Sequence, residues 1–124
     1  MILVTGATGF IGKRFISLLA KNYPKDKITC FVLNRKRKIE DTGRKILRSI
    51  GIMSIRGDLV TGKGLYRLPR KPEVIFHLAA NTHTDEPDHR VNDLGTKNLL
   101  EAIGPLDKNS LFVHVSTTMF MAGR

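Results

Sequence analysis

Five short apolar runs alternate with helical patterns along this 124-residue sequence, and this alternation limits the possible folds more than any other feature. The runs lack the polar alternation of a half-solvated strand, so they predict strands that are buried on both faces. Between them, apolar residues recur at the three- and four-residue intervals of amphipathic helices. The expected strands lie at residues 1–6, 27–33, 52–55, 73–80 and 110–117, and the expected helices at 10–22, 39–50 and 88–104.

Strands that alternate with helices predict a parallel sheet covered by helices on both faces. We therefore expect one α/β domain over residues 1–124, a doubly wound parallel sheet of about five strands. Residues 62–72, which contain Pro69, predict only a short helical turn. Gly43 lies in the middle of the second expected helix and weakens that assignment.

The composition is that of a basic globular domain with a net charge of +10, which favours anionic partners. Nucleic acid is an unlikely partner, because the sequence has no Trp and few other aromatic residues for base stacking. No apolar run approaches the length of a membrane span, and the N-terminus has no secretory signal pattern. The single cysteine, Cys30, lies in an expected strand as a buried thiol, so we expect a cytoplasmic protein.

Three glycines, Gly6, Gly9 and Gly12, separate the first expected strand from the first expected helix. One glycine allows an unusual φ at the turn, a second lets the backbone approach a pyrophosphate, and a third lets the helix pack on the sheet. The helix N-terminus adds free N–H groups and the positive end of its dipole. This segment predicts a dinucleotide site; the alternative is a tight turn that binds nothing.

Four basic residues follow the second expected strand in the stretch LNRKRK, residues 33–38. At this place an acidic residue favours the ribose hydroxyls of NAD, whereas an arginine accommodates the 2′-phosphate of NADP. No Asp or Glu is present, and Arg35, with Lys36 or Arg37, supplies charge-assisted hydrogen-bond donors. The stretch therefore predicts NADP as the cofactor, with NAD as the alternative.

Five motifs occur in a fixed order: TGATGFIG (5–12), GDL (57–59), HLAA (77–80), VNDLGTKNLLEA (91–102) and FVHVSTT (112–118). Together they resemble the extended short-chain dehydrogenase/reductases, a superfamily of NAD(P)-dependent sugar epimerases, dehydratases and reductases. The resemblance covers nearly the whole chain. It implies the N-terminal half of a Rossmann fold, with strand order 3-2-1-4-5.

The resemblance also implies roles for individual residues. The cofactor-binding positions that it implies, together with the two arginines above, are Gly6, Thr8, Gly9, Phe10, Ile11, Gly12, Asp58, Leu59, Ala79, Ala80 and Asn92. Asp58 would accept a hydrogen bond from the adenine amine, and Asn92 would help to order the site. Asp58 as a turn cap and Asn92 as a helix-surface amide are the alternatives.

The catalytic hydroxyl of the family is matched by Ser116, Thr117 or Thr118, with Thr118 in the best alignment. These hydroxyls have a simpler alternative role, which is to solvate the end of a strand. The family also needs a Tyr-x-x-x-Lys pair on the helix after the fifth strand, where the lysine lowers the pKa of the tyrosine. The segment YPKDK (23–27) has this spacing but lies at the wrong end of the sheet, and Arg70 follows Tyr66 where lysine is required.

Without this pair and without a substrate lobe, we expect an NAD(P)-binding module that catalyses nothing alone. A non-catalytic nucleotide-binding or redox-sensing protein is the alternative, and a basic nucleic-acid binder is a weaker one. The side chains of one further group could together suggest a metal site: His77, His83, Asp85, Glu86, Asp88 and His89. We expect no metal there, since His77 belongs to a strand and the others form a polar loop.

Overall fold

The structure, a computed structural model, describes residues 1–80 and 88–115. Its five strands form one parallel sheet in the order β3-β2-β1-β4-β5, which confirms the expected doubly wound topology. The strands are β1 (Ile2–Thr5), β2 (Ile28–Leu33), β3 (Met53–Gly57), β4 (Val74–His77) and β5 (Leu111–His114).

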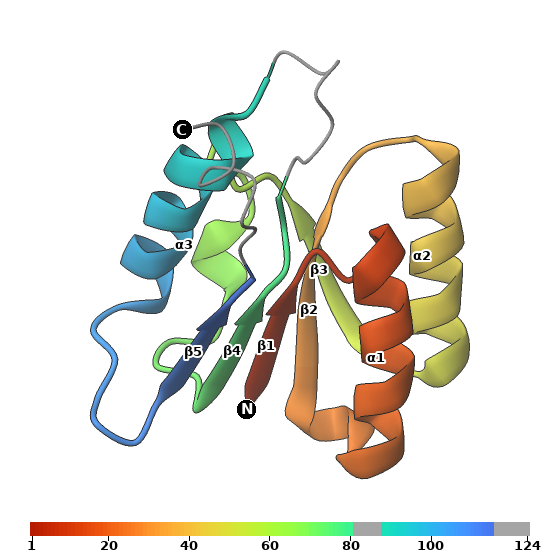
Figure 1. Cartoon of the computed structure of the whole chain (residues 1–124), viewed down its shortest axis with the longest axis horizontal. Coiled ribbons are helices and arrows are strands. Elements are labelled where there is room, and N and C mark those ends of the chain that lie inside the picture. The colour runs from red at the N-terminus through yellow and green to blue at the C-terminus, as the bar shows by residue number, and fades with distance from the viewer. Residues whose placement is uncertain (81–87, 116–124) are drawn as a thin grey trace, which may run out of the picture.

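Helices cover both faces of this sheet (Figure 1). On one face lie α1 (Phe10–Asn22) and α2 (Lys38–Ile50), and on the other lie α3 (Thr96–Ile103) and the short η2 (Leu65–Arg67). A further short helix, η1 (Lys25–Lys27), precedes β2.

One element differs from the expected continuous helix over residues 88–104. A π-helical turn, η3 (Val91–Gly95), precedes α3. Gly95 lies against the loop that follows β3, where a Cβ atom on the glycine would come within 3.2 Å of Leu59 Cβ. Apolar periodicity alone does not distinguish such a local widening from a regular helix.

Two apolar clusters form the core, one on each face of the sheet. The cluster under α1 and α2 includes Val4, Ile16 and Leu47, and the cluster under α3 includes Leu3 and Leu99. Each of these side chains is at most 1 % exposed. Residues 3 and 4 of β1 therefore point to opposite cores, which is why this strand shows no polar alternation.

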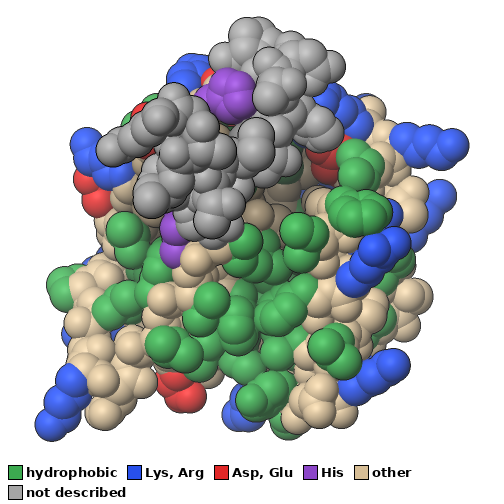
Figure 2. All heavy atoms as spheres, viewed as in Figure 1, with side chains coloured by type: hydrophobic (Ala, Val, Ile, Leu, Met, Phe, Trp, Pro, Cys, Tyr) green, Lys and Arg blue, Asp and Glu red, His purple; other side chains and the backbone are tan. Residues whose placement is uncertain are grey.

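Beyond α1, two apolar side chains in and directly after β5 remain exposed on the face of the sheet that α1 covers over β1. Leu111 is 56 % and Val115 44 % exposed. Figure 2 shows hydrophobic side chains gathered on this side of the molecule. Within the described ranges, no helix is long and apolar enough to cross a membrane.

Helix α2 packs directly on the loop that follows β1, and Gly43 makes this possible. A Cβ atom at Gly43 would lie 2.5 Å from Thr8 Cα. This backbone contact explains a glycine that, in sequence terms, only weakens the helix.

We therefore expect Gly43→Ala to lower the free energy of unfolding by about 1–3 kcal/mol through overpacking. The gain of about 1 kcal/mol in helix propensity offsets part of this loss. Because the new Cβ meets backbone at 2.5 Å, the overpacking cost should lie in the upper part of that range, which leaves a net decrease of about 1–2 kcal/mol. Urea unfolding measures the change, and Thr42→Ala on the exposed side of α2 is the control. A Gly43→Ala protein as stable as the wild type would show that α2 does not need this close approach.

Candidate functional site

The carboxyl ends of the five parallel strands lie along one edge of the sheet, at the top in Figure 1. The strand order reverses between β1 and β4, and such a switch point is where open α/β sheets bind ligands. The glycine loop that follows β1 and the Leu78–Ala79 segment that follows β4 meet here.

Two glycines of the loop are required by the fold itself. Gly6 has a φ of 73°, and a Cβ atom there would lie 2.6 Å from Ala79 N. A Cβ atom at Gly12 would lie 1.9 Å from Gly6 O. A side chain at either position would therefore disrupt the packing of the loop against β4 or of α1 against the loop.

Gly9 is different, because none of the described residues requires a glycine there. Its φ of −76° and ψ of 179° suit any residue. Among the described residues, a Cβ atom would meet only Gly6 O, at the ordinary contact distance of 3.4 Å. The packing of the described residues thus explains Gly6 and Gly12, and none of those residues fills the space next to Gly9.

Helix α1 begins beside this space with its first N–H groups available. Gly9, its N-cap residue, supplies no side-chain hydrogen bond, and the first turn holds no acidic residue. Phe10 and Ile11 are 60 % and 63 % exposed, and the Arg14 guanidinium lies 4.3 Å from the centre of the Phe10 ring. Thr8, in contrast, is buried beneath α2.

A chain of hydrogen bonds below the loop joins β1, β4 and α3 through His77. Thr5 Oγ1 accepts a hydrogen bond from Ala79 N (3.2 Å) and lies 2.7 Å from His77 Nδ1. His77 Nε2 lies 2.8 Å from Thr96 Oγ1, which donates to Asn92 O (3.0 Å). Sequence reasoning missed this network because its members are 19 and 72 positions apart.

These directions assign the proton of the imidazole. Because the Thr96 hydroxyl donates to a carbonyl, it accepts from His77 Nε2–H, and Nδ1 accepts from the Thr5 hydroxyl. With one ring nitrogen donating and the other accepting, the neutral imidazole makes a hydrogen bond with both Thr5 and Thr96. Burial, with a smaller contribution from the nearby His114, lowers the pKa of His77 to about 4.

The turn after β3 is held by Asp58, whose Oδ1 accepts from Val60 N (2.8 Å). Asp58 therefore caps this turn through Oδ1, which is the alternative role that the sequence left open. Leu59 is buried in the core, and its carbonyl accepts from Asn98 Nδ2 (2.7 Å), a residue that sequence reasoning overlooked. The turn is thereby attached to α3. Adenine binding by Asp58 and Leu59 stays a prediction.

The arginine predicted to select the cofactor has a carboxylate partner. Arg35 donates from Nε (3.0 Å) and Nη2 (2.5 Å) to Oε1 of Glu40, a buried residue in the first turn of α2. Glu40 Oε2 is buried and makes no hydrogen bond with the described residues. Arg37 is exposed and precedes the first residue of α2. The sequence has no acidic residue between positions 34 and 38, but the first turn of α2 places the Glu40 carboxylate next to Arg35.

The remaining predicted positions fall in two groups. Ala79 is half-buried against Gly6, whereas Ala80 and Asn92 are exposed after β4 and in η3. Ser116, Thr117 and Thr118 lie outside the described residues.

Among the described residues, no three His, Cys, Asp or Glu side chains form a group that could hold a metal. His83, Asp85 and Glu86 also lie outside those ranges.

Cys30 is fully buried in β2, as expected. Burial raises the pKa of its thiol to about 12, so the reactive thiolate is scarce at neutral pH. This environment argues against redox sensing through the thiol.

The sheet order, the glycine loop and the uncapped start of α1 define a Rossmann-type nucleotide-binding domain. The family model described as "NAD dependent epimerase/dehydratase family" matches residues 2–123. The chain belongs to this family.

Curated relatives include dTDP-glucose 4,6-dehydratase from Streptomyces antibioticus, 31% identical over 94% of this chain and 37% of the relative. UDP-glucose 4-epimerase from Mycoplasma genitalium is 30% identical over 86% of this chain and 33% of the relative. The chain thus spans about a third of the length of these relatives.

Two solved structures carry different nicotinamide cofactors. UDP-glucuronic acid 4-epimerase from Bacillus cereus, a variant complexed with NAD and a fluorinated UDP-sugar, matches with a TM-score of 0.70 and 27% identity, over 94% of this chain and 40% of that chain. The NADPH complex of a quinone oxidoreductase from Escherichia coli matches with a TM-score of 0.62 and 22% identity, over 82% of this chain and 32% of that chain. The latter similarity concerns the fold alone.

The burial of neutral His77 makes stability depend on pH. Its pKa falls from 6.5 to about 4 on folding, so the unfolded chain binds the extra proton first. Its contribution is complete above pH 6.5 and is lost as the pH falls towards 4, a loss of roughly 3 kcal/mol. We expect His77→Gln to flatten the curve of unfolding free energy against pH in this window, measured by urea unfolding.

His89→Gln, which changes an exposed histidine, should leave that curve as in the wild type. If the His77→Gln and wild-type curves run parallel between pH 4 and 6.5, the neutral buried imidazole is not the group that titrates.

Proposed function

We propose that this chain is the dinucleotide-binding module of an epimerase-, dehydratase- or reductase-type oxidoreductase, that it prefers NADP over NAD, and that it catalyses nothing alone. The proposal that the isolated chain is inactive is supported by its sequence, which offers no suitably placed Tyr-x-x-x-Lys pair. We also propose a cytoplasmic location, with which a free, buried cysteine is compatible.

Gly9 is the observation that carries dinucleotide binding. A glycine that the described residues do not require, directly before a helix N-terminus without a side-chain cap, leaves room for a ligand to approach the backbone. The first N–H groups of α1 would then bind the pyrophosphate oxygens. The family model, whose description names NAD, and the solved epimerase complexed with NAD support the same assignment.

The preference for NADP rests on the charges that follow β2. The exposed residues from Asn34 to Ile39 include four cations and no carboxylate. A 2′-phosphate at this place would replace or share the Glu40 carboxylate as the partner of Arg35. Glu40 is therefore a competitor of the phosphate, and removing its charge should strengthen the preference.

Gly9→Ala should weaken NADPH and NADH binding at least tenfold, because its methyl group occupies the space that the pyrophosphate needs. The unfolding free energy should stay close to that of the wild type, since the nearest atom is 3.4 Å from the new Cβ. Calorimetric titration and urea unfolding measure the two quantities. Unchanged cofactor affinity would mean that the loop is only a structural turn.

Arg35→Ala is best tested with Glu40→Gln already present, since Arg35→Ala alone would leave a buried carboxylate unpaired. Relative to Glu40→Gln, the double variant should bind NADPH about one to two orders of magnitude more weakly, from the loss of a charge-assisted contact. NADH affinity should change little, because NADH has no 2′-phosphate.

Arg37→Ala in the same background tests whether the neighbouring arginine takes this role instead. Equal losses for both cofactors, or a wild-type preference for NADH, would contradict the assignment of NADP.

A further inference from the structure

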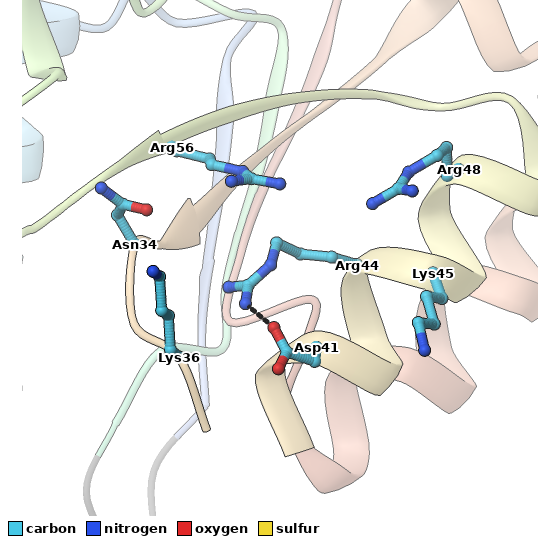
Figure 3. Close-up of a pocket in the computed structure, with 7 residues that line it drawn as sticks. All are labelled: Asn34, Lys36, Asp41, Arg44, Lys45, Arg48 and Arg56. Atoms are coloured by element: carbon cyan, nitrogen blue, oxygen red, sulfur yellow. Dashed lines mark hydrogen bonds and ion pairs between the residues drawn. The ribbon is translucent and has the colours of Figure 1, made fainter. Parts of the chain in front are cut away.

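A second basic site lies between α2, the edge strand β3 and the β2–α2 loop (Figure 3). It is a pocket of about 280 Å³. Its lining residues are Asn34, Lys36, Asp41, Arg44, Lys45, Arg48 and Arg56. Five of these side chains are cationic and one is a carboxylate.

This pocket lies on a different flank of α2 from the glycine loop. Gly43 and Leu47 face Thr8 and the core under α1. The pocket is lined instead by Asp41, Lys45 and Arg48, whose spacing of four and three residues places them on one separate stripe of the helix. The pocket is therefore distinct from the space above Gly9.

Arg44 forms the rigid part of this pocket. Its guanidinium is buried and donates to Leu33 O (3.0 Å), Arg35 O (2.9 Å) and the Asp41 carboxylate. These contacts attach the β2–α2 loop to α2. They also use the only carboxylate of the pocket, so Asp41 is already committed to Arg44.

The other four cations, Lys36, Lys45, Arg48 and Arg56, are exposed and form no ion pair with the described residues. Figure 3 shows Arg56 extending from β3 towards α2, from which Arg44 and Arg48 extend on the facing side. Like charges gathered around one hollow repel each other and create a positive potential that attracts anions.

We propose that this pocket binds a phosphate-bearing anion. Arginine guanidinium groups match phosphate oxygens in geometry, and lysines add point charges. The pocket volume lies just below the roughly 300–1,000 Å³ of typical small-molecule sites, so it suits a phosphate or pyrophosphate group rather than a whole nucleotide. Asn34, which follows β2, adds a neutral amide side chain to the lining.

The phosphate can come from two sources. One is the 2′-phosphate of NADP, since Asn34 and Lys36 follow β2 where the adenosine ribose is expected. The other is a separate phosphorylated molecule. Only the first source rests on the proposed function; anion binding by the pocket does not.

Inorganic pyrophosphate titrated into the ¹⁵N-labelled Gly9→Ala chain tests the pocket without the glycine-loop site. We expect saturable amide shifts at residues 34–36, 44–48 and 56. The Arg48→Ser/Arg56→Ser variant should bind pyrophosphate at least tenfold more weakly at constant ionic strength. Lys21→Ser/Lys108→Ser, which removes the same charge at exposed positions elsewhere, should bind within about twofold of the parent.

Three results would overturn the proposal: no saturable shift below about 10 mM pyrophosphate, shifts confined to residues 6–12, or an equal loss in the lysine variant. The amide spectra also report whether each variant is folded.

The same titration on the wild-type chain saturated with NADPH or NADH identifies the source. If NADPH but not NADH weakens pyrophosphate binding to the pocket, the 2′-phosphate of NADP is the source. If neither dinucleotide weakens it, the pocket binds a separate anion. Both results support the pocket as a phosphate site. If neither dinucleotide binds the wild-type chain, the proposed function fails, while the pyrophosphate titration still decides the pocket.

Discussion

The arrangement of the nucleotide site depends on backbone-to-backbone contact at three glycines. Gly6 lies against the backbone that follows β4, Gly12 against Gly6, and Gly43 of α2 against Thr8. Each contact is too close for a Cβ atom, so β4, α1 and α2 are held around one loop with almost no side chains between them. The position of the α1 N-terminus, and hence of any bound anion, follows from this packing.

Beneath this loop, polar contacts fix the elements that the glycines bring together. His77 joins β4 to β1 through Thr5 and to α3 through Thr96. Asn98 attaches the turn after β3 to α3. These buried or half-buried bonds are satisfied by neutral groups, which suits a rigid support for a site whose ligand is charged. The cations lie outside this support, around the β2–α2 loop and α2.

Much of the fold could be predicted from the sequence because parallel strands and their helices leave strong local patterns. The bounds of α1 and α2 agree with the patterns to within a residue or two, and the strand order is the one that the family resemblance implies. The π-helical turn at Val91–Gly95 was not predictable, since it depends on contact with Leu59, which lies far away in sequence. For the candidate site, the sequence identified the glycines but not Glu40 or Arg44, whose roles depend on where α2 places their side chains.

By itself the sequence determined the class of fold, the glycine loop and the excess of positive charge, because each is a property of residue type and spacing. Only the tertiary structure decided which glycine the packing of the described residues does not require and which cations have no carboxylate partner among them. It separated Gly9 from Gly6 and Gly12 by the space around each. It also paired Arg35 with Glu40 while leaving Arg48 and Arg56 without a carboxylate among the described residues. Free space and charge pairing are relations between distant segments, and only packing brings those segments together.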